Sequence, residues 1–595
     1  MEEIYPGFPK NAWPLTLTVG NGAIGYNADA TGMQSMNTTY NEFPLVTLSD
    51  WGWHATPWGN ATSNPFVNYP FNYYNISTGR EVGYPMRTGW FNANPHRINL
   101  IQVGLRRRSN TSAPLLPSDL HNGTGSSQQL DPWTGEAVSN FSFGAQAVPI
   151  TTKLACHMDL DLVSWRIDTS LLAETENADS LVLRIAFPYA DDGTPTKSPW
   201  TVSHAGANGQ GSNWDSIADS RHTSTLSMGI DGQSARIART LDHDAYEVVC
   251  RWSDKHYSLV RDDVPHAFVL QHDGSSGSGI SFELSCLLAP PAAQYPVGAT
   301  GAWLTGKSQL TRPLLRNKGA TLPLYTATAA NAAQRWEQFW LAGAAIDLAS
   351  GLDPVTDSEE YLRAFELERR AVLSQYLTRS QSAGSQPPQE TGYTMNSWMG
   401  RFHHEMRFFH QTHFGLWGRP ELLARSDSWF IDALANATSY AKFQGYAGAR
   451  WPKEVGVASA AVSNPGHGMC DAPSVGAMSP NSTFPLLYWN TPSFQNLLIW
   501  QQPHPIWMTE VERLNSPNPT AAQEVEKRMG AVVEATADFM ASFAVPPPVG
   551  SSCLPGCSDE LWLGPPLERQ SASQAPMCNP PLNPPLIVRF RCRSP

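Results

Sequence analysis

The stretch from Arg401 to Leu423, "RFHHEMRFFHQTHFGLWGRPELL", gathers four histidines, three arginines and two glutamates among aromatic side chains. So many histidines suggest a metal site. A zinc-binding helix, however, needs His-Glu-x-x-His, in which two imidazoles lie one turn apart. Here Phe408 stands where the second histidine after His404-Glu405 would be, so the motif fails. A later pair of histidines, three positions apart, has no further ligand in the pattern, and we predict neither a metal nor another cofactor.

The apolar residues of the same stretch spread around the helix that their spacing predicts, which implies burial on most sides. Buried charges persist only when they are paired or serve a ligand. Arg401, His404 and Glu405 therefore belong either to a satisfied ionic network or to a site that recognises sugar hydroxyls. The stretch by itself favours neither interpretation.

Two further stretches, "QGYAGARWPKEVG" and "NLLIWQQPHPIWMTE", combine aromatic rings with planar or charged polar groups. A carbohydrate site needs this mixture, because a sugar has apolar faces for ring contact and hydroxyls for hydrogen bonds. The alternative is a tryptophan-rich core with polar caps. The candidate residues of the two stretches are Arg450, Trp451, Lys453, Glu454, Trp500, Gln501, Gln502 and His504.

Charge and hydropathy exclude two kinds of partner. The net charge of the 595-residue chain is -12, and its longest basic run is Arg106 to Arg108. Nucleic acid is therefore not an expected partner, because phosphate backbones require a basic surface. No apolar run approaches the roughly 18 to 20 residues that cross a bilayer, so we expect no membrane partner.

Acceptor sequences for N-glycosylation indicate a secretory or extracellular protein. They begin at Asn37, Asn60, Asn75, Asn110, Asn122, Asn140, Asn436 and Asn481. The chain also has eight cysteines, which permit disulfides on that route. Since "MEEIYPGFPK" lacks the basic and apolar parts of a leader, we expect the leader to be absent from this chain. A cytoplasmic location is the alternative.

Two kinds of periodicity divide the chain. Apolar residues alternate with polar ones from about 97 to 290, which predicts a large antiparallel sandwich that begins near an Asn21-Gly22 hairpin. The segment 55–80 has neither period and is interpreted as a long ordered loop. Helical spacing follows, beginning with Trp336, Phe339 and Trp340.

We therefore predict a β-sandwich domain at 1–310, a linker-helix region at 311–350 and an all-α, catalytic-type domain at 351–567. The last segment, 568–595, mixes Pro, Arg and Cys without either period. We expect it not to belong to the native fold.

Several motifs together resemble a known superfamily. They are "GNGAIGYNADATGMQSMNTTYNEFPLVTLSDWGWH", "NSWMGRFHHEMRFFHQTHFGLWGRPELL", "QGYAGARWPKEVG" and "LLIWQQPHP". In this order, between about 14 and 566, they resemble an uncharacterised branch of the six-hairpin glycosidases, distantly similar to the maltose and trehalose phosphorylases and to the alpha-fucosidases. The resemblance implies an N-terminal antiparallel β super-sandwich and a C-terminal (α/α)6-type toroid. Twelve helices need roughly 300 to 400 residues, whereas about 240 follow position 350, so we expect the toroid to be incomplete.

The resemblance also implies roles for residues. Glu405 and His404 occupy the place of the sugar-binding residues early in the barrel, preceded by Trp398 and Arg401. The "GARWP" loop implies that Arg450, Trp451 and Lys453 line the same pocket, and we add Gln502 and His504 from "QQPHP". The family's general acid follows a Gly-Pro pair, which places Glu568 in that role one position out of register.

We predict from these features an inverting glycoside hydrolase that acts on an unknown glycan. In that reaction one carboxyl group protonates the leaving oxygen and a second carboxylate activates water. Glu568 is the candidate acid and Glu454 the candidate base. Two alternatives stay open: a non-catalytic or truncated sugar-binding homologue, and a phosphate-dependent phosphorylase, although no glycine-rich anion cradle is present. The sequence names neither the sugar nor an oligomeric state.

Overall fold

The computed structural model describes residues 16–40, 45–54, 71–75, 81–85, 96–120, 126–189, 220–241, 244–275, 279–290, 321–394, 400–455, 498–545 and 562–563. By their contacts, the residues form two units. The first comprises 1–56, 95–400 and 417–419, and the second comprises 57–94, 401–416 and 420–595. The chain is thus of mixed α and β class, with a β-rich N-terminal region and a helical C-terminal region.

Two large antiparallel sheets dominate the first unit. The eight-stranded sheet has the order β14-β15-β16-β19-β12-β11-β10-β9. In chain order its strands are β9 (Ser127–Asp131), β10 (Glu136–Phe143), β11 (Val148–Cys156), β12 (Leu162–Asp168), β14 (His222–Met228), β15 (Ser234–Leu241), β16 (Asp244–Trp252) and β19 (Ser281–Ala289). The four-stranded sheet has the order β17-β18-β13-β8. Its strands are β8 (Gln102–Arg107), β13 (Leu181–Ala186), β17 (Tyr257–Arg261) and β18 (Ala267–His272).

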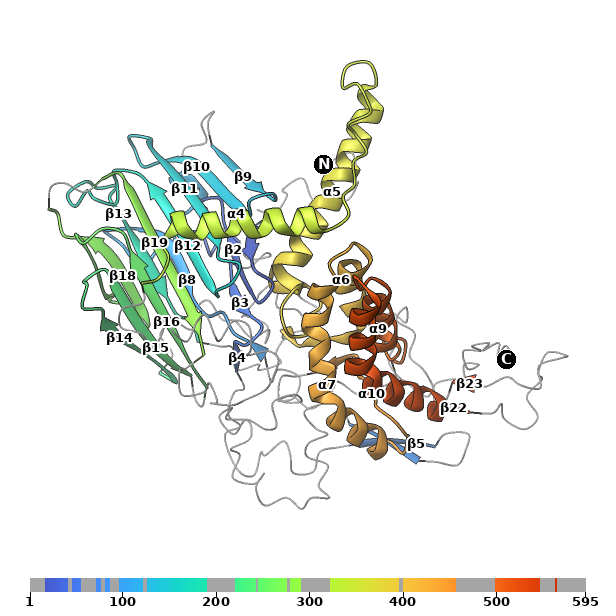
Figure 1. Ribbon diagram of the computed structural model, residues 1–595. Coiled ribbons are helices and arrows are strands. Elements are labelled where there is room, and N and C mark those ends of the chain that lie inside the picture. The colour runs from blue at the N-terminus through green and yellow to red at the C-terminus, as the bar shows by residue number, and fades with distance from the viewer. Residues whose placement is uncertain are drawn as a thin grey trace, which may run out of the picture. The chain divides into compact units, whose positions relative to one another are not determined.

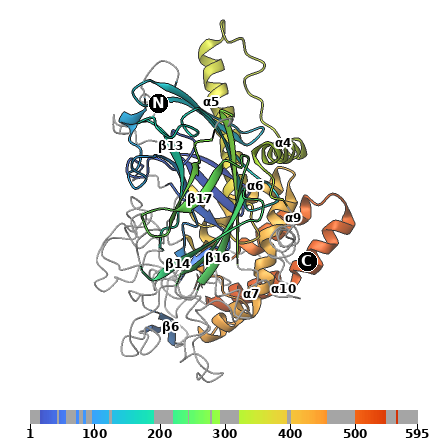
Figure 2. The same ribbon diagram turned by 90° about the vertical axis from the view of Figure 1, so that its left-hand side faces the viewer.

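Both sheets bury residues in one apolar core. Strand β10 alternates strictly between buried and half-buried positions, the period of two that the sequence indicates. The core contains Trp165 and Trp252 from the eight-stranded sheet together with Leu183 and Leu270 from the four-stranded sheet. Figure 2 shows strands of both sheets, with β13 and β17 of one and β14 and β16 of the other. The antiparallel pairing and the alternation expected between about 97 and 290 are therefore confirmed.

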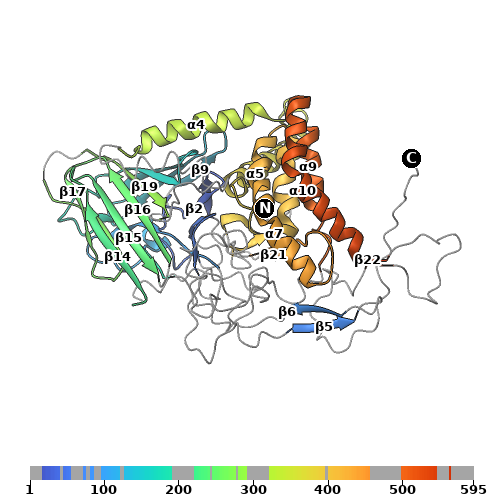
Figure 3. The same ribbon diagram turned by 60° about the horizontal axis from the view of Figure 1, so that its bottom comes forward.

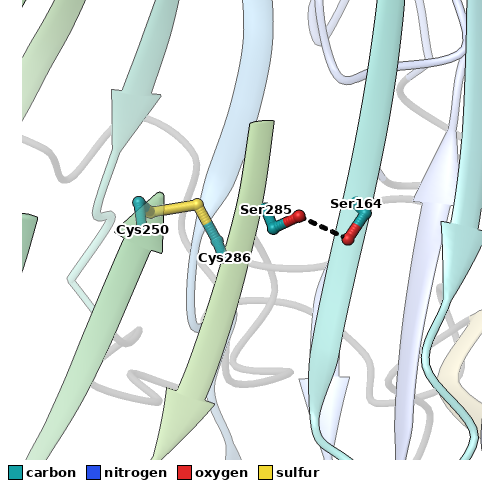
Figure 4. The surroundings of a disulfide bond; sticks show 4 residues. All are labelled: Ser164, Cys250, Ser285 and Cys286. Carbon is teal, nitrogen blue, oxygen red and sulfur yellow. Dashed lines mark hydrogen bonds between the residues drawn. A yellow bond between two sulfur atoms is a disulfide. The ribbon is translucent and has the colours of Figure 1, made fainter. Parts of the chain in front are cut away.

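A disulfide links two neighbouring strands of the larger sheet. Cys250 of β16 and Cys286 of β19 are partners in the register and bond to each other (Figure 4). On the next strand, Ser164 lies 2.7 Å from Ser285 through the two hydroxyl oxygens. The middle of the sheet is therefore held by a covalent bond as well as by its ladder.

The predicted hairpin at Asn21-Gly22 is confirmed. Strands β1 (Leu17–Gly20) and β2 (Ile24–Ala28) pair there, and β3 (Thr47–Ser49) extends this small sheet. The Asn21 side-chain oxygen accepts the backbone N–H groups of Ala23 and Ile24, 2.9 and 3.1 Å away. Gly22 has a φ of +94°, which a residue with a Cβ rarely adopts.

Two helices of the first unit follow its sheets. Helix α4 (Tyr325–Ala342) crosses the strands of the larger sheet (Figure 1), where Thr328 lies 2.9 Å from Ser164. Helix α5 (Ser358–Ser382) contacts β1 and β2, and its Tyr376 hydroxyl donates to the carbonyl of Thr18 at 3.0 Å. These helices belong to the first unit, which includes residues up to Gly400, whereas the predicted all-α domain begins at 351.

Short pairs complete the strands. They are β4 (Trp53–His54) with β7 (His96–Arg97), β5 (Phe71–Asn75) with β6 (Glu81–Pro85), β20 (Phe402–His403) with β21 (Glu454–Val455), and β22 (Ala544–Val545) with β23 (Trp562–Leu563). The interpretation of 55–80 as a loop throughout is wrong for 71–75, which is a strand. The sequence of that strand, FNYYN, shows no alternation of apolar and polar residue types.

The second unit is built from helices α6 (His404–Leu416), α7 (Pro420–Phe443), α9 (His504–Leu514) and α10 (Pro519–Phe543). Helix α9 contacts the other three, and α7, α9 and α10 lie side by side in Figure 3. The stretch 401–423 thus contains β20, helix α6 and the start of α7, and Gly418 takes a φ of +83° between the two helices. The predicted tail, 568–595, lies outside the described residues.

Among the helices that the structure describes, none combines the length and the apolar character needed to cross a membrane.

Candidate functional site

Two segments far apart in the sequence form the centre of the candidate site. Strand β20 pairs with β21, so that Phe402 faces Val455 and His403 faces Glu454 in the register. The pairing continues one step further, because the Glu405 N–H donates to the Lys453 carbonyl at 3.2 Å. Helix α6 begins at His404. A short ladder thus joins the start of α6 to the "GARWPKEV" loop and brings their polar side chains together.

Glu405 is fully buried and is bonded to two donors. Its Oε2 atom lies 2.8 Å from Lys453 Nζ and 3.1 Å from His403 Nε2. Burial raises the pKa of the Glu405 carboxyl, but the hydrogen bonds from His403 and Lys453 and the lysine charge outweigh burial and hold the pKa below its ordinary value. Glu405 is therefore ionised at neutral pH. Its Oε1 atom has no hydrogen-bond partner among the described residues.

Glu454 forms the second buried ion pair. Arg401 Nη1 donates to Glu454 Oε1 at 3.0 Å, and the side chains are 2% and 0% exposed. The Oε2 atom of Glu454, like Glu405 Oε1, has no hydrogen-bond partner within the described part of the chain. Each carboxylate thus has one oxygen held by protein donors and one oxygen for which the described residues supply none.

Two histidines beside these carboxylates are neutral. Burial, aided by the charge of Arg407, lowers the pKa of His404 well below its usual value, and neither ring nitrogen has a hydrogen-bond partner among the described residues. Burial lowers the pKa of His504 to about 4, against the raising effect of its bond to His404. In that bond the His504 Nδ1–H donates to the His404 carbonyl at 2.9 Å, which leaves the lone pair on Nε2.

A third segment, 498–504, supports the loop that carries Lys453 and Glu454. The Trp451 N–H donates to Gln502 Oε1 at 2.9 Å, and Gln502 Nε2 donates to the Ala449 carbonyl at 2.6 Å. Gln501 Nε2 donates to the Trp451 carbonyl at 3.2 Å. The side-chain amides of two glutamines thus replace a strand partner for this loop and fix its backbone.

Arg450 and Trp451 are also held by protein partners. Arg450 Nη2 donates to the Leu498 carbonyl at 2.9 Å, and its guanidinium lies over the Phe539 ring at 5.2 Å. Trp451 is 0% exposed, and its indole N–H donates to Thr536 Oγ1 at 2.8 Å. Both side chains therefore anchor the loop to its neighbours in the second unit.

The arrangement suits neutral polar ligands. Buried ion pairs add little to stability, because removing two charges from water offsets most of their attraction. Two such pairs at the β20–β21 ladder, with neutral imidazoles beside them, instead supply closely spaced hydrogen-bond acceptors and donors with little net charge. Perturbed ionisable groups of this kind are typical of functional sites.

The structure brings most of the predicted site residues together. Hydrogen bonds or ion pairs join Arg401, His404, Glu405, Arg450, Trp451, Lys453, Glu454, Gln502 and His504, directly or through shared neighbours. Trp398 and Glu568 lie outside the described residues. The catalytic and binding roles of all eleven residues stay predictions.

Sequence reasoning missed His403 as a member of the site. It was interpreted as helical, where positions i and i+2 point to different sides, whereas β20 places His403 in a strand immediately before the helix. Alternation along a strand brings residues i and i+2 to one side, and His403 bonds Glu405 accordingly. The signal was Gly400 before the stretch, which marks a break in the backbone at a φ of +68°.

In the part of the chain that the structure describes, no group of three or more His, Cys, Asp or Glu side chains is placed to hold a metal ion. His413 of α6 instead directs Nε2 to the backbone carbonyl of His410 at 3.1 Å.

Comparison with known proteins gave matches only among solved structures. No family model matches the chain, and no curated protein does. A human-microbiome protein named as a kojibiose phosphorylase matches with a TM-score of 0.46, at 10% identity over 88% of this chain and 67% of that one. A bacterial glucoamylase complexed with acarbose matches with a TM-score of 0.36, at 7% identity over 89% and 71% of the two chains.

A glycosyl hydrolase of the GH92 family matches with a TM-score of 0.33, at 12% identity over 92% of this chain and 65% of that one. The chain thus spans about two thirds of the length of each of the three structures. The three structures are thus named as a phosphorylase, a glucoamylase and a glycosyl hydrolase.

Proposed function

We propose that the chain is a glycosidase-type protein that binds a neutral glycan at the Glu405–Glu454 site and hydrolyses it with inversion. The observation that carries the proposal is the pair of buried carboxylates beside the β20–β21 ladder, with Glu405 at the start of α6 and Glu454 on β21. In each carboxylate, one oxygen pairs with a cationic side chain. The other oxygen has no hydrogen-bond partner among the residues that the structure describes. Such oxygens can accept hydrogen bonds from sugar hydroxyls. Independently, the sequence motifs resemble those of six-hairpin glycosidases.

Glu405 is assigned to substrate binding. Its pKa is held below the ordinary value, so it stays an ionised acceptor and is a poor proton donor at neutral pH. The charge-assisted bond from Lys453 fixes the direction of its carboxylate at 2.8 Å. A fixed, ionised acceptor of this kind is suited to a bond from a sugar hydroxyl.

Glu454 is assigned as the general base. In the proposed step it takes a proton from water, whose oxygen bonds to the anomeric carbon while the glycosidic bond breaks. The electron pair of that bond goes to the leaving oxygen, which receives a proton from the acid. Arg401 holds Glu454 through one oxygen and so directs the other. Glu568 is retained as the proposed acid.

At the level of architecture, the proposal places the four helices α6, α7, α9 and α10 in a toroid of the (α/α)6 type, with the sheets of the first unit as the super-sandwich. The helices contact their neighbours in a way that such a ring would require, with α9 against α6, α7 and α10. We retain the proposal of an incomplete ring.

The experiment measures hydrolysis of a panel of aryl glycosides by the chain and by two variants, Glu454→Gln and Glu405→Gln. We expect cleavage of at least one member, with the product first appearing as the opposite anomer by proton NMR. Loss of a general base typically lowers kcat by about a hundredfold or more, whereas loss of Glu405 mainly raises KM. Glu524→Gln, at an exposed position of α10 outside the site, is the matched control.

The alternatives have distinct outcomes in the same experiment. If cleavage requires inorganic phosphate, the protein is a phosphorylase and not a hydrolase. Binding of a monosaccharide, detected by tryptophan fluorescence and abolished by Glu405→Gln, without cleavage of any panel member would favour the non-catalytic homologue. If no sugar is bound or cleaved, the proposal fails.

We also propose that the protein follows the secretory route. Cys250 and Cys286 are paired in the sheet, and disulfides persist mainly in oxidising compartments. Asn110, the first residue of an Asn-Thr-Ser acceptor, is exposed in the turn after β8, where the Ser112 hydroxyl donates to its side-chain oxygen at 2.8 Å. A mass loss at Asn110 on enzymatic deglycosylation of the secreted protein would support the route.

A further inference from the structure

A second group of buried charges lies between the four helices of the second unit, apart from the candidate site. It consists of Arg407 on α6, Asp427 on α7, Glu512 on α9 and Arg528 on α10. Arg407, Asp427 and Glu512 are each 6% exposed or less. The sequence analysis singled out none of the four, and the proposed reaction uses none of them.

Arg407 joins three of the helices. One nitrogen, Nη2, pairs with Asp427 Oδ1, and the other, Nη1, lies 2.8 Å from the Met508 sulfur. Met508 and Glu512 are four positions apart on α9 and so lie on one face of that helix. Asp427 and Glu512 also interact with each other directly, through their charges and their side chains.

The hydrogen-bond donors around Asp427 and Glu512 do not reach all four carboxyl oxygens. Both oxygens of Glu512 accept from Arg528 Nη2, at 2.5 and 2.6 Å. Asp427 has a donor only at Oδ1, and its buried Oδ2 has no hydrogen-bond partner among the described residues. A buried carboxylate oxygen without a donor is unfavourable by roughly 1 to 3 kcal/mol or more. A proton on Glu512 would supply the missing donor.

We infer that Asp427 and Glu512 share one proton, and that the loss of this proton as the pH rises loosens the packing of α9 against α7. This goes beyond the proposed function and does not rest on it. The charged groups that face the pair are Arg407 from α6 and Arg528 from α10, in addition to the two acids of α7 and α9 themselves. The two arginines balance the charge of two carboxylates, but among the described residues no donor forms a hydrogen bond to Asp427 Oδ2.

The electrostatics of Glu512 agree with this geometry. Burial and then the charge of Asp427 raise the pKa of Glu512 to about 7, although Arg528 opposes the shift. A carboxyl group whose pKa is higher in the folded than in the unfolded protein stabilises the fold most fully below the unfolded value, which is near 4.5. That contribution is lost as the pH rises toward about 7. The helical unit is therefore expected to be more stable in acid than in neutral solution with respect to this pair.

The test compares the pH dependence of local unfolding in the wild type and in Glu512→Gln. Hydrogen exchange with mass spectrometry, in peptides from α9 and α10 and corrected for intrinsic exchange, follows the helices separately from the sheets. In the wild type, we expect the opening equilibrium constant to rise by about one to two orders of magnitude between about pH 5 and pH 8. Glutamine has the shape of protonated glutamic acid and can donate to Asp427 Oδ2, so we expect Glu512→Gln to remove most of that rise.

Two further variants make the result decisive. Asp427→Asn removes the second acid and should also flatten the profile, whereas Glu524→Gln, at an exposed site of α10, should retain the wild-type slope. If either pair variant does not fold, the infrared carbonyl band of a protonated carboxyl group, lost between about pH 5 and pH 8 in the wild type, is the alternative readout. An unchanged slope in Glu512→Gln, an equal flattening in Glu524→Gln, or the absence of such a band would overturn the inference. No sugar enters the experiment, so its failure would leave the proposed function standing.

Discussion

Replacing Lys453 by methionine would test how the candidate site is held. Methionine keeps most of the volume of the lysine stem and removes the charge that lies 2.8 Å from Glu405 Oε2. At an effective dielectric constant near 20, two unit charges at this distance attract by roughly 6 kcal/mol, before the desolvation that offsets most of that gain. Because the two side chains are only 8% and 0% exposed, solvent cannot take the place of the lysine. We expect Lys453→Met to lower the free energy of unfolding by about 3 to 5 kcal/mol.

The assay is urea unfolding followed by tryptophan fluorescence, because Trp429 and Trp451 are buried near the site. A double-mutant cycle with Glu405→Gln isolates the pair from the effects of each substitution alone. When the carboxylate is also neutralised, no unpaired buried charge is left. We therefore expect the double variant to be more stable than Lys453→Met, with a coupling energy of about 2 to 3 kcal/mol.

The pH dependence of the same variants gives a second check. The pKa of Glu405 lies below its ordinary value in the fold, so its stabilising contribution is present above the unfolded pKa and is lost as the pH falls through the folded one. In Lys453→Met, the free energy of unfolding should therefore fall less steeply as the pH is lowered. Lys442→Met, at an exposed position of α7, is the control and should change stability by less than about 0.5 kcal/mol. If Lys453→Met is no more harmful than this control, Lys453 and Glu405 do not form a buried pair.

Three further variants test the framework. Replacing Cys250 and Cys286 by serine should destabilise the first unit by about 3 to 4 kcal/mol, since their separation of 36 residues sets the entropy of the loop that the bond closes; equal stability of the wild type with and without reductant would refute this. Gly448→Ala should cost more than about 1 kcal/mol in urea unfolding, because the residue has a φ of +67° and a Cβ would collide with the Ala535 carbonyl; an unchanged midpoint would mean that the loop takes another course. Trp336→Ala should cost about 3 to 5 kcal/mol, because the ring is 1% exposed and stacks in the interior of the first unit, and calorimetry of that transition would detect it.

Local signals in the sequence were sufficient for the regular elements. The alternation along β10 and the Asn21-Gly22 turn depend on the side-chain period and on the backbone preferences of single residues. The helix around Trp336 follows from the same kind of local spacing. These properties act over a few residues, so they can be recognised without knowledge of the fold.

The strand at the start of the 401–423 stretch was not recognised, because Phe402 also fits the helical spacing of the apolar residues that follow it. The strand at 71–75 was missed for a related reason, since polar and aromatic residues there do not alternate. In both cases the strand is defined by hydrogen bonding to a partner strand, β21 for β20 and β6 for β5. Sequence spacing alone carries no information about those partners.

By itself, the sequence determined which residues are able to do chemistry in this protein: the carboxylates, imidazoles and cations of three separate motifs, together with the elements next to them. Only the tertiary structure decided how they are paired, with Glu405 bound by Lys453 and Glu454 bound by Arg401. The physical reason is distance. Ion pairing and burial depend on separations of a few ångströms between residues that lie about 50 to 100 positions apart along the chain, and those separations exist only after the helices and the short β20–β21 ladder have packed.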